Sequence, residues 1–389
     1  MSNAEKAKKY IDGLTINSPV NIPEKVIEGD SFFTWDNEKR SVLSQPYLFQ
    51  WSYYNGVVFE GLYDIYLANG EEKYKTYAKR YLDLLIDEGG LIFRRAGYVN
   101  CHGADCYKTA ALLSRFAGCN KNYDNVLRAL YEDLTSENKQ NDDGKAICKD
   151  FAESSLGGNF WHTWRGCRPP KRYKLWLDGI YMIQPFLARY SVFCGDNSQA
   201  EKIARRIKYV AENMRSPVGL YFHAANGGGD NCPYFWTRAS GWYAMALVDV
   251  AEAFTGVNGY VTTVCGDALK AFTDGILKYR MANGMYLNLT DRPESFTNRG
   301  ETSGTSMIVY SLLKGVRLGL LDESYIQPAL ESFCGVCESK LSCEGLKDIY
   351  FKASANGENN YENAADYLTD EGKGVGPFIM AYSEALRLI

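Results

Sequence analysis

One carboxylate of the chain, Asp178, lies in the middle of a helical segment that is apolar on nearly every side and that we predict over residues 173–193. Apolar side chains share its face at helical spacing and fill the other faces, so this helix is expected to be buried. Burial disfavours the charged form of an acid that has no obvious partner, and a carboxyl that stays protonated near neutral pH can serve as a general acid. The alternative is an acid that pairs with a core arginine or caps a neighbouring helix.

A second pair of candidate residues, Arg238 and Trp242, lies in the segment Trp236-Thr-Arg-Ala-Ser-Gly-Trp. The two are four residues apart and share a helix face. A guanidinium group binds a carboxylate through two parallel hydrogen bonds, and an indole offers a flat wall on which a sugar ring can stack. Together they predict a pocket for an anionic sugar. The alternative is a core tryptophan beside an arginine that pairs with a structural acid.

The chain has three histidines, His102, His162 and His223, and each lies in a predicted loop ahead of a candidate helix. A structural hydrogen bond is the ordinary role of a lone histidine, but the placement of all three near aromatic residues makes each a candidate site residue. Asp105 stands at the start of another predicted helix. It is either a second functional carboxylate or an ordinary helix cap.

A metal site is not expected. The possible ligands show no paired zinc-ligand spacing, and the sequence contains no phosphate-binding loop, nucleophile elbow or zinc-protease motif. We therefore predict an enzyme that works without a cofactor. The possible ligands are Cys101, His102, Cys106, His223 and Cys232.

The elements that would position these residues are helices. Long amphipathic segments alternate with short links such as Asn69-Gly70 and Cys194-Gly-Asp-Asn197, and short links between long helices make antiparallel hairpins. Twelve helices form six hairpins if the last pairs with the first, which predicts an all-α (α/α)6 barrel. No linker divides the chain, so residues 1–389 are expected to form one domain. The predicted helices cover about 4–13, 47–69, 71–88, 105–117, 122–136, 173–193, 198–214, 236–255, 261–281, 302–318, 323–338 and 376–388.

The composition excludes several classes of partner. The 389 residues carry a net charge of −4 without a long basic run, which argues against nucleic acid.

No apolar run is long enough to span a membrane. The 11 cysteines are an odd number, which favours reduced thiols and a cytoplasmic protein. The opening Met1-Ser-Asn-Ala is typical of a cloning remnant, which leaves export open. The 29 tyrosines, 18 phenylalanines and 7 tryptophans suit a pocket that stacks sugar rings.

Six motifs in this order resemble family 105 glycoside hydrolases, the unsaturated rhamnogalacturonyl hydrolases, which are similar to the family 88 unsaturated glucuronyl hydrolases. The resemblance runs from about residue 45 to the end, and it implies an (α/α)6 barrel that acts on small anionic oligosaccharides left by polysaccharide lyases. The motifs are Trp51-Ser-Tyr-Tyr-Asn-Gly, Asn159-Phe-Trp-His, Leu175-Trp-Leu-Asp-Gly-Ile-Tyr-Met, Trp236-x-Arg-x-x-Gly-Trp, Glu301-Thr-Ser-Gly-Thr-Ser-Met and Gly374-Val-Gly-Pro-Phe.

The resemblance also implies a reaction and a set of site residues. Asp178 would protonate C4 of a terminal 4,5-unsaturated uronic acid and help water to add at C5, and Asp105 would be the second acid. The resemblance favours unsaturated galacturonyl-rhamnose units from pectin as substrate. Two departures from the family pattern, the basic stretch 165–172 and a short segment after His223, predict an altered specificity and, for the basic stretch, an extra anionic group on the substrate. The expected substrate-binding residues are Tyr53, His162, His223, Arg238, Trp242 and Trp176.

Three other functions remain open at this point. An inverting (α/α)6 glycosidase would use Asp105 and Asp178 as base and acid on saturated sugars. A sugar epimerase on the same barrel would depend on His162 and His223. A non-catalytic barrel would bind an anionic oligosaccharide without turnover.

Overall fold

The computed structural model describes residues 2–14, 51–86, 88–90, 92, 104–135, 175–226, 229–351, 353 and 361–388. Within these residues the chain is mostly helical, with three short helical turns of the 3-10 type and three small two-stranded sheets. The α-helices are α1 (Asn3–Leu14), α3 (Tyr53–Asn69), α4 (Glu72–Leu85), α5 (Cys106–Ser114), α6 (Lys121–Thr135), α8 (Leu177–Cys194), α9 (Ser198–Asn213), α10 (Thr237–Phe254), α11 (Gly259–Ile276), α12 (Thr302–Arg317), α13 (Ile326–Ser339) and α14 (Gly372–Leu386). The 3-10 turns are Leu277–Tyr279, Glu323–Tyr325 and Ala364–Asp366.

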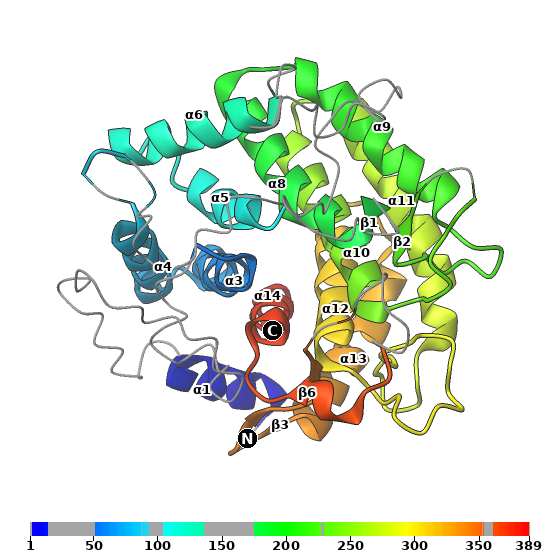
Figure 1. Ribbon diagram of the computed structural model, residues 1–389. Helices are drawn as coiled ribbons and strands as arrows, with labels where there is room; N and C mark the ends of the chain where they lie inside the picture. Colours follow the sequence, from blue (N-terminus) through cyan, green and yellow to red (C-terminus); the bar gives the residue numbers. More distant parts are fainter. Residues whose placement is uncertain are drawn as a thin grey trace.

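Six of these helices form a closed inner ring. In ring order, α3 packs on α5, α5 on α8, α8 on α10, α10 on α12, α12 on α14, and α14 returns to α3. The helices α4, α6, α9, α11 and α13 each pack outside the inner helix that precedes them, and α1 packs against α14 and α13. Figure 1 looks along this double ring. The predicted (α/α)6 barrel is confirmed.

The hairpins follow from local sequence signals. Gly70 ends α3 and Gly195 ends α8, each in the left-handed conformation (φ 77° and 73°) that glycine adopts without steric cost. Each glycine reverses the chain within a few residues, so the next helix runs back outside the first. The short links of the sequence therefore make the antiparallel pairs α3–α4 and α8–α9.

The inner helices are buried on nearly every side, whereas the outer helices bury one face. In α10 almost every residue from Thr237 to Ala251 is buried, while in α9 the buried positions recur at helical spacing between exposed charged residues. Several predicted helix boundaries differ from those of the structure, including two helix starts. The helix expected from 173 begins at Leu177, because Leu175 and Trp176 pair as a strand, and the helix expected from 376 begins at Gly372, where the Glu371 carboxylate accepts the backbone N–H of Lys373.

The inner helices also bring a network of charged side chains into the barrel. Lys314 of α12 donates to Asp249 of α10 (2.7 Å) and to Glu252 (2.8 Å), and Asp249 is fully buried. On the other side of the ring, the carboxylate of Glu60 in α3 pairs with Lys108 and with Arg189 of α8. Buried ions are tolerated because each has partners of opposite charge.

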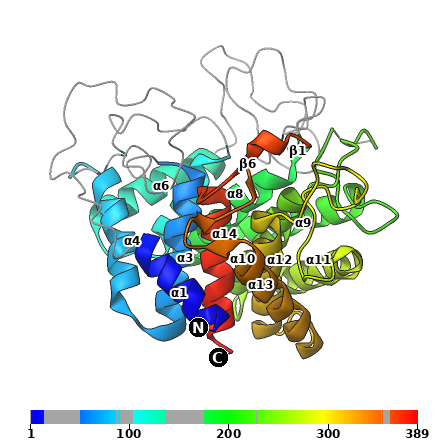
Figure 2. The ribbon, with the colours of Figure 1, turned by 90° about the horizontal axis from the view of Figure 1, so that it is seen from below.

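Strands β1 (Leu175–Trp176) and β6 (Tyr367–Leu368) lie at the end of the barrel opposite to the labelled N- and C-termini (Figure 2). The strand β1 pairs with β2 (Ala224–Ala225), and β5 (Ile349–Tyr350) pairs with β6, all antiparallel. The third pair joins β3 (Leu341–Ser342) to β4 (Gly345–Leu346). Among the helices that the structure describes, none is both long and apolar enough to cross a membrane.

Candidate active site at the barrel mouth

The inner helices all run in the same direction, so their N-termini meet at one end of the barrel, which we call the mouth. Strands β1 and β6, which lead into α8 and α14, mark this end in Figure 2. Several of the candidate residues lie here because they sit just before or within the first turn of an inner helix. These residues are Tyr53, Asp105, Trp176, Asp178 and Arg238.

The short β1–β2 pairing brings Asp178 and His223 together. Trp176 pairs with Ala224, and the backbone N–H of Leu177 donates to the carbonyl of His223 (3.0 Å). His223 directly precedes β2, and Asp178 follows β1 by two residues in the first turn of α8. Their side chains lie side by side, with His223 Nε2 3.2 Å from Asp178 Oδ2. This contact joins residues 45 positions apart in the chain.

The expected setting of Asp178 was wrong in two respects. Asp178 lies in the first turn of α8 rather than in the middle of a buried helix, and its side chain keeps 14% of its surface exposed. It also has a polar partner, His223, which the helix pattern did not reveal. The carboxyl group is therefore reachable from the mouth, and it stands at a helix N-terminus, where a negative charge is favoured.

His223 is fully buried among aromatic rings. Its ring centroid lies 4.9 Å from that of Trp176 and 4.9 Å from that of Trp236. Its second nitrogen, Nδ1, lies 2.5 Å from the hydroxyl oxygen of Tyr361. Both imidazole nitrogens are thus hydrogen-bonded, one to an acid and one to a phenol.

Tyr361 is a site residue that sequence reasoning missed. Its ring stacks on Tyr234 with centroids 4.4 Å apart, and its hydroxyl oxygen lies 3.6 Å from Cys232 Sγ. Its backbone carbonyl accepts a hydrogen bond from Asn288 Nδ2 (2.8 Å). Burial, with smaller contributions from Cys232 and the Asp178 carboxylate, raises the pKa of Tyr361 far above its usual range. No periodic pattern surrounds this tyrosine, so the sequence offered no signal for it.

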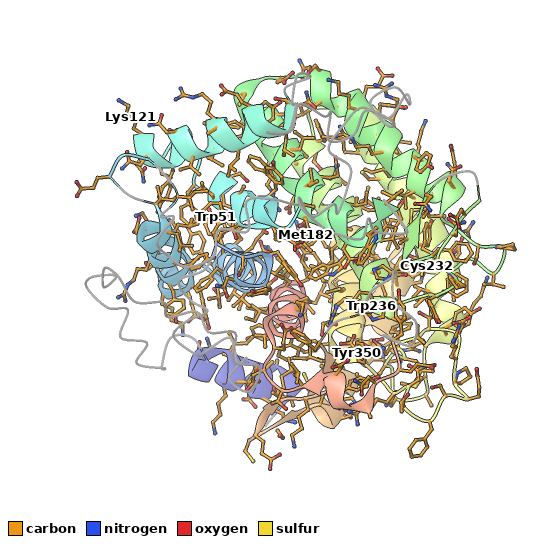
Figure 3. The ribbon with its side chains drawn as sticks, in the orientation of Figure 1. Trp51, Lys121, Met182, Cys232, Trp236 and Tyr350 are labelled. Atoms are coloured by element: carbon orange, nitrogen blue, oxygen red, sulfur yellow. The ribbon has the colours of Figure 1, made fainter. Side chains whose placement is uncertain are left out.

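Trp236 was also missed, although the sequence held a signal. Trp176 and Trp236 occupy the same position, immediately before α8 and α10, and each is followed two residues later by a charged residue, Asp178 or Arg238. The Trp236 indole donates to Asn288 Oδ1 (2.9 Å). Figure 3 shows Trp236 with Cys232 and Tyr350 on one side of the barrel, across the axis from Trp51.

Arg238 is buried, and its guanidinium group holds the chain at β5. It donates to the backbone carbonyls of Tyr350 and Phe351, the second at 3.1 Å, and its Cζ lies 4.4 Å from the ring centre of Trp236. Its predicted partner on the same helix, Trp242, packs elsewhere: it is 1% exposed and stacks on Tyr181 of α8 in the core. The structure therefore favours a packing role for Trp242, and the indole beside Arg238 is Trp236.

Tyr53 and Asp105 lie near each other at the start of α3 and α5. The Asp105 side chain makes no cap hydrogen bond to α5, so the simple N-cap interpretation was wrong. Burial raises the pKa of Tyr53 well above its usual range, and the charges of Asp105 and Glu371 add to this effect while Arg238 opposes it. Tyr53 therefore keeps its proton, and the charges that act on it come from Asp105, Glu371 and Arg238.

Several predicted features lie outside the described residues. They are His102, His162, Cys101 and the basic stretch 165–172.

Comparison with known proteins agrees with this architecture. The family model described as Glycosyl Hydrolase Family 88 matches residues 32–389. The chain belongs to glycosyl hydrolase family 88. It is therefore a glycoside hydrolase, and the resemblance to families 105 and 88 that its motifs predicted is confirmed.

Individual relatives of this family 88 protein are moderately similar to it. A solved family 105 glycoside hydrolase from C. acetobutylicum has 26% sequence identity and a TM-score of 0.72, with 87% of this chain and 94% of that chain covered. The unsaturated rhamnogalacturonyl hydrolase YesR of Bacillus subtilis is 22% identical over 320 residues, which are 78% of this chain and 85% of YesR. Protein Atu3128 of Agrobacterium fabrum is 29% identical over 230 residues, 52% of this chain and 98% of its own.

Proposed function

We propose that this glycoside hydrolase removes the non-reducing terminal 4,5-unsaturated uronic acid from oligosaccharides made by polysaccharide lyases. The observation that carries the proposal is the Asp178 carboxyl group, partly exposed at the mouth and 3.2 Å from the fully buried His223. A carboxyl group that is partly exposed and is held in place by a buried neighbour is suited to deliver a proton to a bound substrate. The name of the Bacillus relative supports unsaturated galacturonyl-rhamnose as the substrate.

In the proposed reaction, Asp178 acts first as an acid and then as a base. Its carboxyl proton is transferred to C4, the electron pair of the C4=C5 bond forms the new C4–H bond, and the positive charge at C5 is shared with the ring oxygen. Water adds at C5 while its proton passes to the Asp178 carboxylate, which restores the acid. The resulting hemiketal opens to a 5-keto sugar acid and releases the remaining sugar.

Other residues of the mouth take supporting roles in this proposal. Asp105 is the second acid near the substrate, and Tyr53 and Trp176 line the sugar site with His223. The two terminal nitrogens of the Arg238 guanidinium group donate to the backbone carbonyls of Tyr350 and Phe351. The proposed role of Arg238 is therefore to hold this segment in place. His162 keeps the substrate-binding role that the family resemblance implies for it.

The test follows the ultraviolet absorbance of the unsaturated uronyl group. Wild type and Asp178→Asn are incubated with unsaturated galacturonyl-rhamnose and with unsaturated glycosaminoglycan disaccharides. A saturated disaccharide with the same second sugar, assayed for released sugar, is the matched substrate control. We expect wild type to consume only the unsaturated compounds and Asp178→Asn to lose at least about a thousandfold in kcat, because no other group is proposed to protonate C4.

The outcomes separate the proposal from its rivals. Turnover of the saturated disaccharide at a similar rate would show ordinary glycoside hydrolysis instead. Binding of the unsaturated compounds without turnover would indicate a non-catalytic barrel. Activity that survives in Asp178→Asn would refute the proton-donor role while leaving the substrate class intact.

A further inference from the structure

The hydrogen bonds of His223 determine where its proton lies. Among the described residues, its two ring nitrogens contact Tyr361 Oη (Nδ1, 2.5 Å) and Asp178 Oδ2 (Nε2, 3.2 Å). A neutral imidazole carries one N–H, so one nitrogen donates and the other accepts. The direction of the hydrogen bond between the Tyr361 hydroxyl and Nδ1 therefore decides whether Nε2 donates a hydrogen bond to Asp178 or accepts one from it.

The orientation of Tyr361 can be worked out from its neighbours. The phenol stays protonated, because burial and the nearby Cys232 and Asp178 raise its pKa. Its single hydrogen has two possible acceptors: Nδ1 of His223 at 2.5 Å, and Cys232 Sγ at 3.6 Å. A thiol sulfur is a weak acceptor and an imidazole nitrogen is a good one, so the hydroxyl donates to Nδ1.

We propose that Tyr361 is a positioning residue that fixes the tautomer of His223, so that the imidazole N–H lies on Nε2 and donates to Oδ2 of Asp178. The inference builds on the proton-donor role proposed for Asp178. With Oδ2 held as an acceptor, the transferable proton resides on Oδ1. The Nε2–H bond then strengthens as Asp178 gives up its proton, since it stabilises the carboxylate that forms in the transition state.

The rings of Trp176 and Trp236 flank His223 and carry no charge. Two cations stand behind aromatic rings: Arg238 lies over Trp236, and Arg292 lies 4.7 Å from the ring centre of Tyr234, which stacks on Tyr361. Among the described residues, the titratable groups that face His223 and Tyr361 include Asp178, Cys232 and Tyr234, the last stacked on Tyr361.

The tautomer can be measured directly, without substrate. The chain has only three histidines, so nitrogen-15 labelling of histidine gives a simple spectrum, and His223→Gln assigns the His223 signals. We expect the wild-type spectrum to show a protonated Nε2 and an unprotonated Nδ1. Tyr361→Phe should lose this preference, whereas the matched control Cys232→Ala, which removes the other neighbour of the hydroxyl, should keep it.

The pH profile supplies a second readout that a purely structural role would not change. A hydrogen bond to the carboxylate lowers the pKa of an acid, so its loss raises that pKa. The decline of kcat/KM at high pH reflects deprotonation of the acid, so in Tyr361→Phe we expect this basic limb of the pH profile to move to higher pH by about one unit. We expect kcat to fall about tenfold and KM to stay within about twofold of wild type.

Either readout can overturn the inference. A wild-type spectrum with the proton on Nδ1 would refute it, even if Tyr361→Phe failed to fold. So would a Tyr361→Phe variant with an unchanged tautomer and an unchanged basic limb. Failure of the proposed reaction would leave the spectrum unaffected, so the two proposals can fail separately.

Discussion

The buried charge network makes Lys314→Met a sharp test of how the barrel interior is stabilised. The Lys314 side chain is 1% exposed, and its ammonium group donates to Asp249 (2.7 Å), Glu252 (2.8 Å) and the hydroxyl of Tyr310 (2.8 Å). Methionine matches the length of the lysine stem but supplies no charge. The substitution therefore leaves a fully buried carboxylate, Asp249, without its closest cation.

The expected cost can be estimated from what remains around Asp249. Removing one partner of a buried ion pair costs about 3–5 kcal/mol. Tyr310 still donates to Asp249 (2.7 Å), and Arg189 Nη2 remains 3.6 Å from Asp249 Oδ2, so the negative charge of Asp249 is still partly compensated. We therefore expect the lower end, about 3 kcal/mol, which is about a hundredfold in the unfolding equilibrium constant.

Urea-induced unfolding, followed by both circular dichroism and tryptophan fluorescence, measures this cost and tests for a single transition. The matched control is Lys79→Met, since Lys79 pairs with Asp83 at 2.8 Å on the exposed surface of α4. Exposed pairs contribute at most about 1 kcal/mol, so this variant should be nearly neutral. Adding Asp249→Asn to Lys314→Met should recover part of the loss. If Lys314→Met cost no more than Lys79→Met, the network would not depend on charge balance and our reasoning would be refuted.

Two further predictions concern the same scaffold. Gly275→Ala should destabilise the fold by at least about 2 kcal/mol in urea unfolding, because a Cβ there would stand 2.1 Å from the carbonyl oxygen of Gly219. Gly259→Ala, on the same helix with nothing within 4 Å, should be neutral or stabilising, and equal effects would contradict the packing argument. Burial raises the pKa of Asp64 from 3.8 to about 6, so the folded chain binds more protons than the unfolded chain between these values and loses stability as pH rises through them. Asp64→Asn should therefore gain stability relative to wild type as pH rises from 4 to 6, and a pH-independent difference would be evidence against this shift.

The sequence predicted the helices well because their signals are local. Apolar spacing, the polar outer faces and the Gly-containing links each act within a few residues, and together they were enough to predict six hairpins and a closed ring. One boundary error has a cause that is not local. The start of α8 at Leu177 depends on the pairing of β1 with β2, which no pattern within the helix records.

The candidate site was predictable only in part. Asp178 and His223 were both singled out, but they are 45 positions apart and their contact depends on the pairing of β1 with β2, which could not be foreseen. Periodicity singled out Trp242 beside Arg238, but α10 is buried all round, so periodicity could not tell which face meets the mouth, and the indole next to Arg238 is that of Trp236. Tyr361 reaches His223 from a segment without regular structure, where sequence patterns carry least information.

The way in which the inner ring closes has a consequence for folding. The helices α3 and α14 are separated by some 300 residues, yet they pack against each other so closely that Gly61 faces Ile379 and Gly376 faces Val57 with no room for a Cβ. During synthesis, the buried face of α3 has no partner on that side until α14 leaves the ribosome. Such distant contacts carry a high loop-closure cost, so the barrel should fold slowly and late, with the α3–α14 seam as its final step.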